Sequence, residues 1–509
     1  MLIAIFKLIC GNSWKHADFI ATFGLLNNRK DMTTAPKQND MKRELGVLDA
    51  TMLVAGSMIG SGIFIVSSDI TRHVGSAGWL IAIWLLTGAI TVIAALSYGE
   101  LSAMFPNAGG QYVYLREAYN RLTAFLYGWA LFMVIQAGTI AAVAVAFAKF
   151  AAYIFPSLGD DRVVWNLPLV PVHAAQLVAI ATIVLLTWIN SRGVRNGKII
   201  QTLFTLIKIL SLGGLTVMGL SVGFNEAVWD ANWSAAWDTL RWDAGTGTSV
   251  SIGGAAVFAG IVSAMVGSLF SSDAWNNVTF IAGEIRNPKR NIGLSLFLGT
   301  LIVTVIYVSA NLMYLATLPM EEIAFAPADR VGVAAAQAIF GGAGTVVIAV
   351  MIMISTFGCN NGLIMAGARV YYTMAQDGLF FRKAATLNKS EVPGWGLWAQ
   401  CIWTSLLCLT GRYGDLLNYV VFTVLIFYAL TITGVFVLRR TRPRAERPYK
   451  AFGYPFLPAC YVLTALTICT GLLIYQPTFT WPGLIIVLLG IPVFFIWNRR
   501  VRADPPVDR

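Results

Sequence analysis

Two short stretches rich in glycine and serine interrupt long apolar runs, and together they could bind a small zwitterion. The first lies between Gly56 and Gly62, and the second between Gly267 and Asn277. Such residues weaken a helix, and the halves of a broken helix end in unpaired backbone N–H groups or carbonyls. N–H groups suit a carboxylate and carbonyls suit an ammonium group, so the two breaks are complementary to an α-amino acid. The alternative is close packing of helices through small residues.

Three other polar features lie within apolar runs, where ionisable groups are costly in lipid and usually functional. Lys208 could bridge the first broken helix to the eighth apolar span in place of a sodium ion, or it could extend to the cytoplasmic interface. Asp273 could bind a basic substrate side chain, carry a proton or cap a half-helix. Ser355 opens the polar stretch 355–361, which could line the site and accept a hydrogen bond from Lys208, or could join neighbouring helices.

The chain that must position these residues has the composition of a membrane protein with many spans. Of its 509 residues, 57% are hydrophobic and 12% are charged, whereas a soluble domain carries roughly 25% charged residues. Only helices or closed barrels satisfy the backbone in lipid, and the apolar runs are continuous rather than alternating, which predicts helices. We expect about twelve spans. They lie at 47–70, 78–104, 122–155, 174–190, 198–223, 256–283, 292–317, 334–375, 394–411, 415–438, 455–475 and 479–498.

The charges of the loops predict how these spans are oriented. Basic residues gather in every second loop, for example 192–198, 286–290 and 439–450, whereas the remaining loops hold isolated ones such as Arg72 and Arg330. Because positive residues stay cytoplasmic, we expect a multi-pass protein of the cell (plasma) membrane with its N- and C-termini cytoplasmic.

Two segments outside the spans carry predictions of their own. Residues 1–44 are expected to form a cytoplasmic tail, and translation could instead start at Met32 or Met41. The external loop 224–250 contains four tryptophans among acidic residues. Tryptophans at such a place serve as anchors at the membrane interface, and a lid over the entrance is the alternative.

Several other classes of function lack the residues that they need. The net charge of +11 comes from basic residues in short loops, so it does not indicate nucleic-acid binding. The six cysteines and three histidines show neither metal-ligand nor disulfide spacing, so no metal site is expected. The sequence contains no phosphate-binding glycine loop ending in Lys-Ser/Thr and no GxSxG motif. We therefore expect neither an enzyme nor a bound cofactor.

These motifs resemble the amino acid–polyamine–organocation superfamily, and most closely its L-type amino acid transporter branch. The likeness runs from about residue 45 to about 450. Its main stretches are GSMIGSGIF at the first break, Tyr98–Trp129, WNNVTFIAGEIRNPKRNI after the second break, and STFGCNNG. The resemblance implies an all-α LeuT-type fold of about twelve transmembrane helices, with two inverted repeats of five in which helices 1 and 6 are broken.

This fold implies the following domain boundaries. The first repeat takes residues 45–223, and the second takes 224–438 with its preceding external loop. Residues 439–498 supply a cytoplasmic loop and two further helices, and residues 499–509 form a cytoplasmic tail.

The resemblance also implies roles in a substrate site. Gly60, Ser61 and Gly62 would bind the carboxylate through backbone N–H groups and the Ser61 hydroxyl. The carbonyls that would accept from the ammonium group belong to Met58 and to four consecutive residues, Phe270, Ser271, Ser272 and Asp273. Phe270 also matches the aromatic gate that closes over substrate, and Asn276 matches an asparagine near the substrate.

Lys208 matches the fifth-helix lysine of sodium-independent members, and Ser355 would share the position of the sodium site with it. An acid at Asp273 resembles members that accept cationic substrates, and it departs from the glycines that are common there in the family. The loop 155–171 after the third span has no cysteine, so we expect no covalently attached heavy chain.

We therefore predict a sodium-independent amino acid transporter that works as a monomeric exchanger by alternating access in the lipid bilayer. Neutral amino acids are favoured as substrates, with cationic ones as further candidates. The alternatives are an amino acid or polyamine symporter driven by protons or sodium, and a membrane sensor that binds amino acids without moving them.

Overall fold

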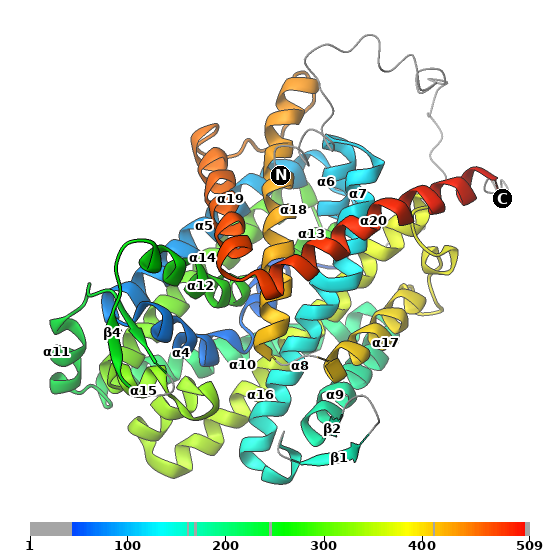
Figure 1. Cartoon of the computed structure of the whole chain (residues 1–509). Helices are drawn as coiled ribbons and strands as arrows, with labels where there is room; N and C mark the ends of the chain where they lie inside the picture. The colour runs from blue at the N-terminus through cyan, green and yellow to red at the C-terminus, as the bar shows by residue number, and fades with distance from the viewer. Residues whose placement is uncertain (1–42, 160–161, 167–170, 244–246, 411–412, 504–509) are drawn as a thin grey trace.

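The computed structural model shows a bundle of long helices (Figure 1) and describes residues 43–159, 162–166, 171–243, 247–410 and 413–503. Of the predicted tail 1–44, all but the last two residues lie outside the described residues. The fold class predicted from the sequence is confirmed, because nearly all of the described chain is helical.

The first five predicted spans are helices at the expected places. The first is divided into α3 (Val47–Met58) and α4 (Gly62–Val74). The third joins α7 (Arg121–Ala130) to α8 (Gln136–Ile154) through a π-helical turn at Leu131–Ile135. The second, fourth and fifth are α5 (Ala77–Met104), α9 (Ala174–Ser191) and α10 (Val194–Ser221).

The other seven predicted spans also correspond to helices. The sixth is divided into α12 (Ala255–Ser271) and the short α13 (Asn277–Phe280). The remaining ones are α14 (Pro288–Thr317), α16 (Val331–Gln376), α17 (Gly394–Thr410), α18 (Tyr413–Thr441), α19 (Phe456–Tyr475) and α20 (Pro477–Ala503).

Short elements connect these spans at the two ends of the bundle. One end carries hairpin β1–β2 (Val163–Asn166 and Pro171–His173), α11 (Glu226–Ser234), hairpin β3–β4 (Leu240–Trp242 and Ser249–Ser251), α15 (Met320–Ala324) and the turn η4 (Pro327–Asp329). The opposite end carries α6 (Gln111–Ala118) and the C-terminal end of α18 (Figure 1).

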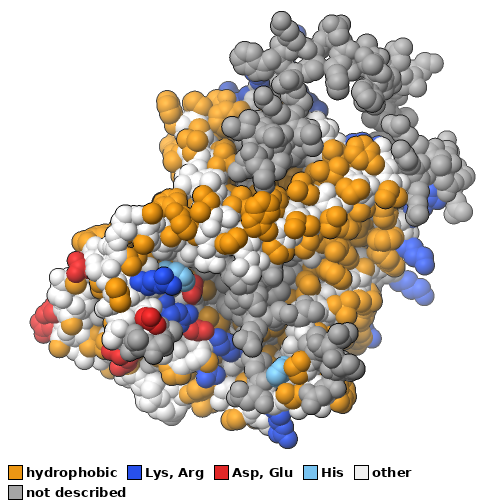
Figure 2. Space-filling view, in the orientation of Figure 1, with side chains coloured by type: hydrophobic (Ala, Val, Ile, Leu, Met, Phe, Trp, Pro, Cys, Tyr) orange, Lys and Arg blue, Asp and Glu red, His pale blue; other side chains and the backbone are white. Residues whose placement is uncertain are grey.

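The outer surface fits a lipid environment. Among the described residues, nine helices are long and apolar enough to cross a membrane, and α3 with α4 makes a further span bent by 43°. Figure 2 shows hydrophobic side chains spread over the flank formed by α19 and α20, whereas charged side chains gather around α4 and α11. Little of this apolar flank is buried against other parts of the protein, so we infer that it faces the lipid tails of a membrane.

Among the first ten spans, helices that pack together have counterparts, five spans later or earlier, that also pack together. Helix α10 packs on α16 as α18 packs on α8, and α9 packs on α8 as α17 packs on α16. Counterpart spans also touch each other, since α5 packs on α14 and α8 on α16. Such an arrangement is expected of two inverted repeats that face each other.

Both breaks are shorter than the sequence suggests. Gly56 lies within α3, and a Cβ there would lie 2.0 Å from the Thr205 hydroxyl oxygen of α10. Gly267 lies within α12, and a Cβ there would lie 2.3 Å from Val66 of α4. These two glycines therefore serve close helix packing, and the non-helical residues are only 59–61 and 272–276.

The eighth predicted span is also divided. Gly341 has a left-handed backbone with φ of 69°, which separates the short helix Val331–Gly342 from the apolar stretch Gly344–Gln376. Glycine adopts this conformation at no steric cost, so the single predicted span 334–375 begins outside the helix that crosses the membrane.

A buried carboxylate fastens α5 to the last turn of α18 and to the segment that follows it. Glu100 is 1% exposed, and its two oxygens form ion pairs with Arg439 at 2.6 Å and with Arg447 at 3.2 Å. The backbone N–H of Ala451 donates to the same carboxylate at 2.8 Å. The guanidinium of Arg439 also lies over the ring of Tyr454, 3.7 Å from its centre.

Replacing Glu100 by alanine should destabilise the fold strongly, by about 3 kcal/mol, because two partly or fully buried cations lose their partner. The midpoint of thermal unfolding in detergent measures this. A matched control is Glu446→Gln, because Glu446 is exposed and its pair with Lys289 spans 3.4 Å at the surface. Equal melting temperatures for the two variants would contradict the prediction.

Candidate functional site

The break in the first span leaves carbonyls at the end of α3 that other helices satisfy. The carbonyl of Gly56 accepts from Lys208 Nζ at 2.6 Å, and that of Ser57 accepts from the Cys359 thiol at 3.0 Å. The Tyr307 hydroxyl lies 2.9 Å from the carbonyl of Met58. A lysine, a thiol and a phenol from α10, α16 and α14 therefore replace the next turn of helix.

Lys208 holds the break itself as well as the helix end. Its ammonium nitrogen lies 2.8 Å from the Ile59 carbonyl, in addition to its contact with Gly56, and the side chain is 1% exposed. The alternative that Lys208 extends to the interface is wrong, since the side chain ends inside the bundle. Ser355 of α16 approaches from the other side, with its hydroxyl 3.3 Å from the Ile59 carbonyl and 3.4 Å from that of Gly60.

After Ser355, the polar stretch shows one of its two predicted roles, the joining of helices, at Asn361, whereas Thr356 shows neither. The Thr356 hydroxyl donates within its own helix, to Ile352 at 3.0 Å. Asn361 joins helices, because its side chain accepts from Asn190 of α9 at 2.8 Å and donates to Gln201 of α10 at 3.3 Å. Ser355 and Cys359 of this stretch contact the broken helix directly.

The second break lies directly against the first. A Cβ on Gly62 would lie 1.9 Å from the Ser271 hydroxyl oxygen, so only glycine lets helices α4 and α12 approach this closely. The Tyr307 hydroxyl lies 3.0 Å from the Ser271 carbonyl as well as 2.9 Å from that of Met58. One hydroxyl proton serves two acceptors, so Tyr307 couples the two helix ends.

Within the second break, Ala274 adopts a left-handed backbone with φ of 64°. This turn places Asp273 beside α18, where its carboxylate accepts a 2.5 Å hydrogen bond from the Tyr428 hydroxyl. The Asn276 amide donates to Gln111 at 3.0 Å, and Gln111 donates to Thr431 of α18 at 3.0 Å. Asp273 and Asn276 of the break thus bond to α18 and α6.

Two small cavities meet at Asp273. One lies between the break, α8 and α18, and its polar lining includes Gln111, Gln136 and Asn276. The other lies towards α5 and α19. Asp273, Val424 and Tyr428 line both. The carboxylate therefore faces the space on either side of the break.

The predicted site residues do not all reach this space. Asp273 and Asn276 line the first cavity, and Ser272 with Asp273 lines the second. The described lining of neither cavity includes Phe270, Ser271 or the first-break residues, which are Met58, Gly60, Ser61 and Gly62. Those residues are buried where the two breaks touch.

Sequence reasoning missed Tyr307, Tyr428 and Cys359, which contact the breaks from other helices. Tyrosine and cysteine are common in apolar helices, so their types alone gave no signal. The available signal was the need of a broken helix for hydrogen-bond donors, because its free carbonyls in a membrane must be satisfied by neighbouring helices. Each of the three supplies one such donor.

Comparison with known proteins agrees with this architecture. The family model described as "Amino acid permease" matches residues 45–498. The chain is 28% identical over 473 residues to the Asc-type amino acid transporter 1 of Mus musculus, which covers 91% of this chain and 83% of that protein. It is 28% identical over 469 residues to the Large neutral amino acids transporter small subunit 2 of Homo sapiens, covering 91% and 82%.

A third relative is the b(0,+)-type amino acid transporter 1 of Mus musculus, 27% identical over 479 residues and covering 92% of both chains. The matched family model spans both breaks, Lys208 and all of the described transmembrane helices except the last residues of α20. The chain therefore belongs to the amino acid permease family and is a membrane transporter rather than an enzyme.

Proposed function

We propose that this protein is a sodium-independent amino acid exchanger that works by alternating access. The observation that carries the proposal is the ammonium group of Lys208 on the carbonyls of Gly56 and Ile59. A sodium ion bound between a broken helix and the eighth span would use such carbonyls. A fixed cation already supplies this charge, so the cycle needs no sodium.

For the substrate, the backbone N–H groups of Gly60, Ser61 and Gly62 are proposed to bind the carboxylate. The carbonyls of Met58 and of the 270–273 segment are proposed to accept from the ammonium group. Met58 and Ser271 now share the Tyr307 hydroxyl, so the ammonium group of the substrate would bond to these carbonyls beside that hydroxyl or in its place. Phe270 is proposed as the gate that closes over the bound molecule.

The side chain of the substrate is proposed to enter the cavity beside Asp273. Leu131, Ile135 and Val424 line this space, which favours neutral apolar side chains. Asp273 gives cationic side chains a partner once Tyr428 yields its hydrogen bond. The three relatives are named as Asc-type, large neutral and b(0,+)-type amino acid transporters, so their names differ in substrate class and the proposal for this chain rests on the lining.

For orientation, we propose that the end with α11 and α15 is external and that the chain lies in the plasma membrane with both termini cytoplasmic. The basic residues at the opposite end, such as Arg116, Arg121 and Arg442, support this. The repeat boundaries 45–223 and 224–438, followed by 439–498, are part of the same proposal.

The oligomeric state is a separate part of the proposal. One relative's name designates it as a small subunit. This chain has no cysteine in the loop 155–171, so we propose a monomer without a disulfide-linked partner at that loop. A single band at the same position on reducing and non-reducing gels of native membranes is the expected result.

Uptake into liposomes tests the central proposal. Purified protein should take up labelled neutral amino acids at the same rate with and without sodium, and faster when amino acid is present inside. Dependence on a sodium or proton gradient would instead identify a symporter. Binding by calorimetry without any flux would identify a sensor, and the transport proposal would then be wrong.

Replacing Lys208 by alanine should reduce exchange by at least about a hundredfold, because two carbonyls at the break lose a charged donor inside the membrane. The melting temperature and the amount of folded protein are measured in parallel. Lys289→Ala is a matched control, because that lysine is exposed at the surface. Exchange at the wild-type rate in the Lys208 variant would refute the proposed role.

Replacing Asp273 by asparagine should weaken transport of arginine or lysine about tenfold more than transport of leucine, because only the cationic side chain loses a charge partner. The Tyr428 hydroxyl can still donate to the amide oxygen, which keeps the local structure. Competition of each amino acid against labelled leucine provides the measurement. An equal loss for both kinds of substrate would show that Asp273 acts on the helix break instead.

A further inference from the structure

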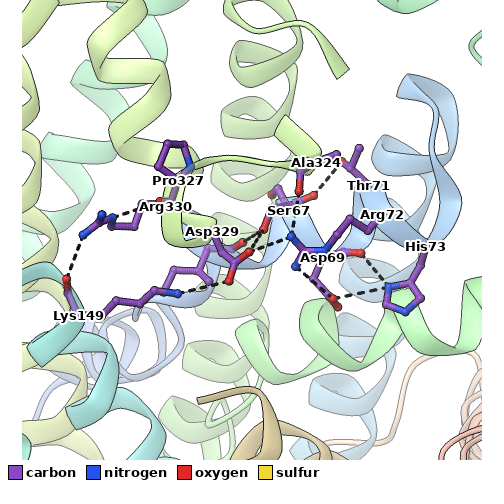
Figure 3. Close-up of polar contacts among 12 residues, drawn as sticks. Ser67, Asp69, Thr71, Arg72, His73, Lys149, Ala324, Pro327, Asp329 and Arg330 are labelled. Carbon is purple, nitrogen blue, oxygen red and sulfur yellow. Dashed lines mark hydrogen bonds and ion pairs between the residues drawn. The ribbon is translucent and has the colours of Figure 1, made fainter. Parts of the chain in front are cut away.

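A charged network lies at the end of the bundle that carries α15. Asp329, at the end of turn η4, lies between α4 and α8 (Figure 3). Its carboxylate forms an ion pair with Arg72 of α4 at 2.8 Å and another with Lys149 of α8 at 3.4 Å. Ser68 of α4 adds a hydroxyl 3.4 Å from the same carboxylate.

Neighbouring groups fix both sides of this contact. Arg72 also donates to the Ala324 carbonyl at 2.9 Å, which ties α15 to α4. On the other side, the guanidinium of Arg330 lies over the ring of Tyr153, 4.9 Å from its centre, and donates to the Lys149 carbonyl at 3.4 Å. The loop after α14 is thus bonded to the half-helix that follows the first break and to the third span.

The same loop has a strained backbone. Ala328 and Asp329 are consecutive non-glycine residues with φ of 52° and 59°. This left-handed conformation crowds Cβ against the following carbonyl, so side chains adopt it at a cost. The ion pairs of Asp329 hold the loop in this conformation, and loss of the pairs would let it relax.

The electrostatic environment favours the ionised form of the Asp329 carboxylate. Burial alone would raise the pKa of Asp329, but the charges of Lys149 and Arg72 and their hydrogen bonds bring that pKa below its usual value. The two cations therefore gain the full attraction of the carboxylate as long as the loop stays in place.

We propose that Asp329 is a reversible latch for the external entrance, joining the movable half-helix α4 to α8 when the entrance is closed. The proposal rests on alternating access, in which one end of the carrier opens while the other is shut. The ion pairs favour the closed loop and the strained backbone favours the open one. Because the ion pairs are only partly buried, water can replace the partners of Asp329, so the pairs can break and form again in each transport cycle.

A cysteine placed beneath the loop reports its opening. Ser68 is buried and faces Asp329, so a thiol at this position is reachable from outside only when the loop lifts. The Ser68→Cys chain is expressed in cells and treated with a membrane-impermeant maleimide without substrate. The chain without this substitution gives the background from its native cysteines.

In the Ser68→Cys chain, adding Asp329→Asn should speed labelling about three- to tenfold, because the loop loses both ion pairs. Glu322→Gln is the matched control, an exposed acid on the same loop, and should leave the rate unchanged. Ala328→Gly should slow labelling about two- to fivefold, because glycine adopts the left-handed backbone without strain.

Equal labelling rates for Asp329→Asn and Glu322→Gln would overturn the latch. If the Asp329 variant does not reach the cell surface, Lys149→Gln replaces it; it removes one of the two ion pairs, so it should give a smaller increase, and no increase would again overturn the latch. A faster or unchanged rate in Ala328→Gly would overturn the opposing role of the strain. Labelling needs no transported substrate, so expected rates with no amino acid uptake in liposomes would leave the latch standing and refute the transport proposal instead.

Discussion

The unpaired carbonyls at the end of α3 are the constraint on which the site depends. No water is available in the middle of a membrane, so each carbonyl that a helix break frees must find a donor in the protein. Lys208, Cys359 and Tyr307 meet this demand from three different helices. The charge of Lys208 is buried for the same reason, since carbonyl dipoles from two residues stabilise it.

A shared hydrogen-bond donor also couples the two breaks. Tyr307 offers a single hydroxyl proton to the carbonyls of Met58 and Ser271, and Gly62 rests against the Ser271 side chain. A ligand group that takes over one of these carbonyls changes the hydrogen bonding of the other. Binding at one helix break can therefore alter the hydrogen bonds of the second break directly, without a long chain of intervening contacts.

The sequence predicts the helices well because apolar length and loop charge are local properties. Each expected span corresponds to a helix, usually within about three residues. It predicts the breaks less exactly, since glycine serves both bending and close packing, and only the neighbour decides which. Gly56 and Gly267 face Thr205 and Val66 and stay helical, whereas Gly60 lies in the break. The donors Tyr307 and Cys359 are 36 to 302 residues away from the carbonyls that they satisfy, which no local pattern reveals.

Solvent exposure distinguishes ion pairs that are suited to stay formed from those that can break and form again. Glu100 is 1% exposed and holds two arginines, so breaking its pairs would leave charges with little access to water. Asp329 is 39% exposed, and water can replace Arg72 and Lys149 as they separate. Glu100 and its two arginines are thus suited to a permanent contact between α5, the last turn of α18 and the segment after it. The half-exposed pair is suited to a contact that forms and breaks repeatedly, and it lies on the half-helix that begins at the substrate-binding break.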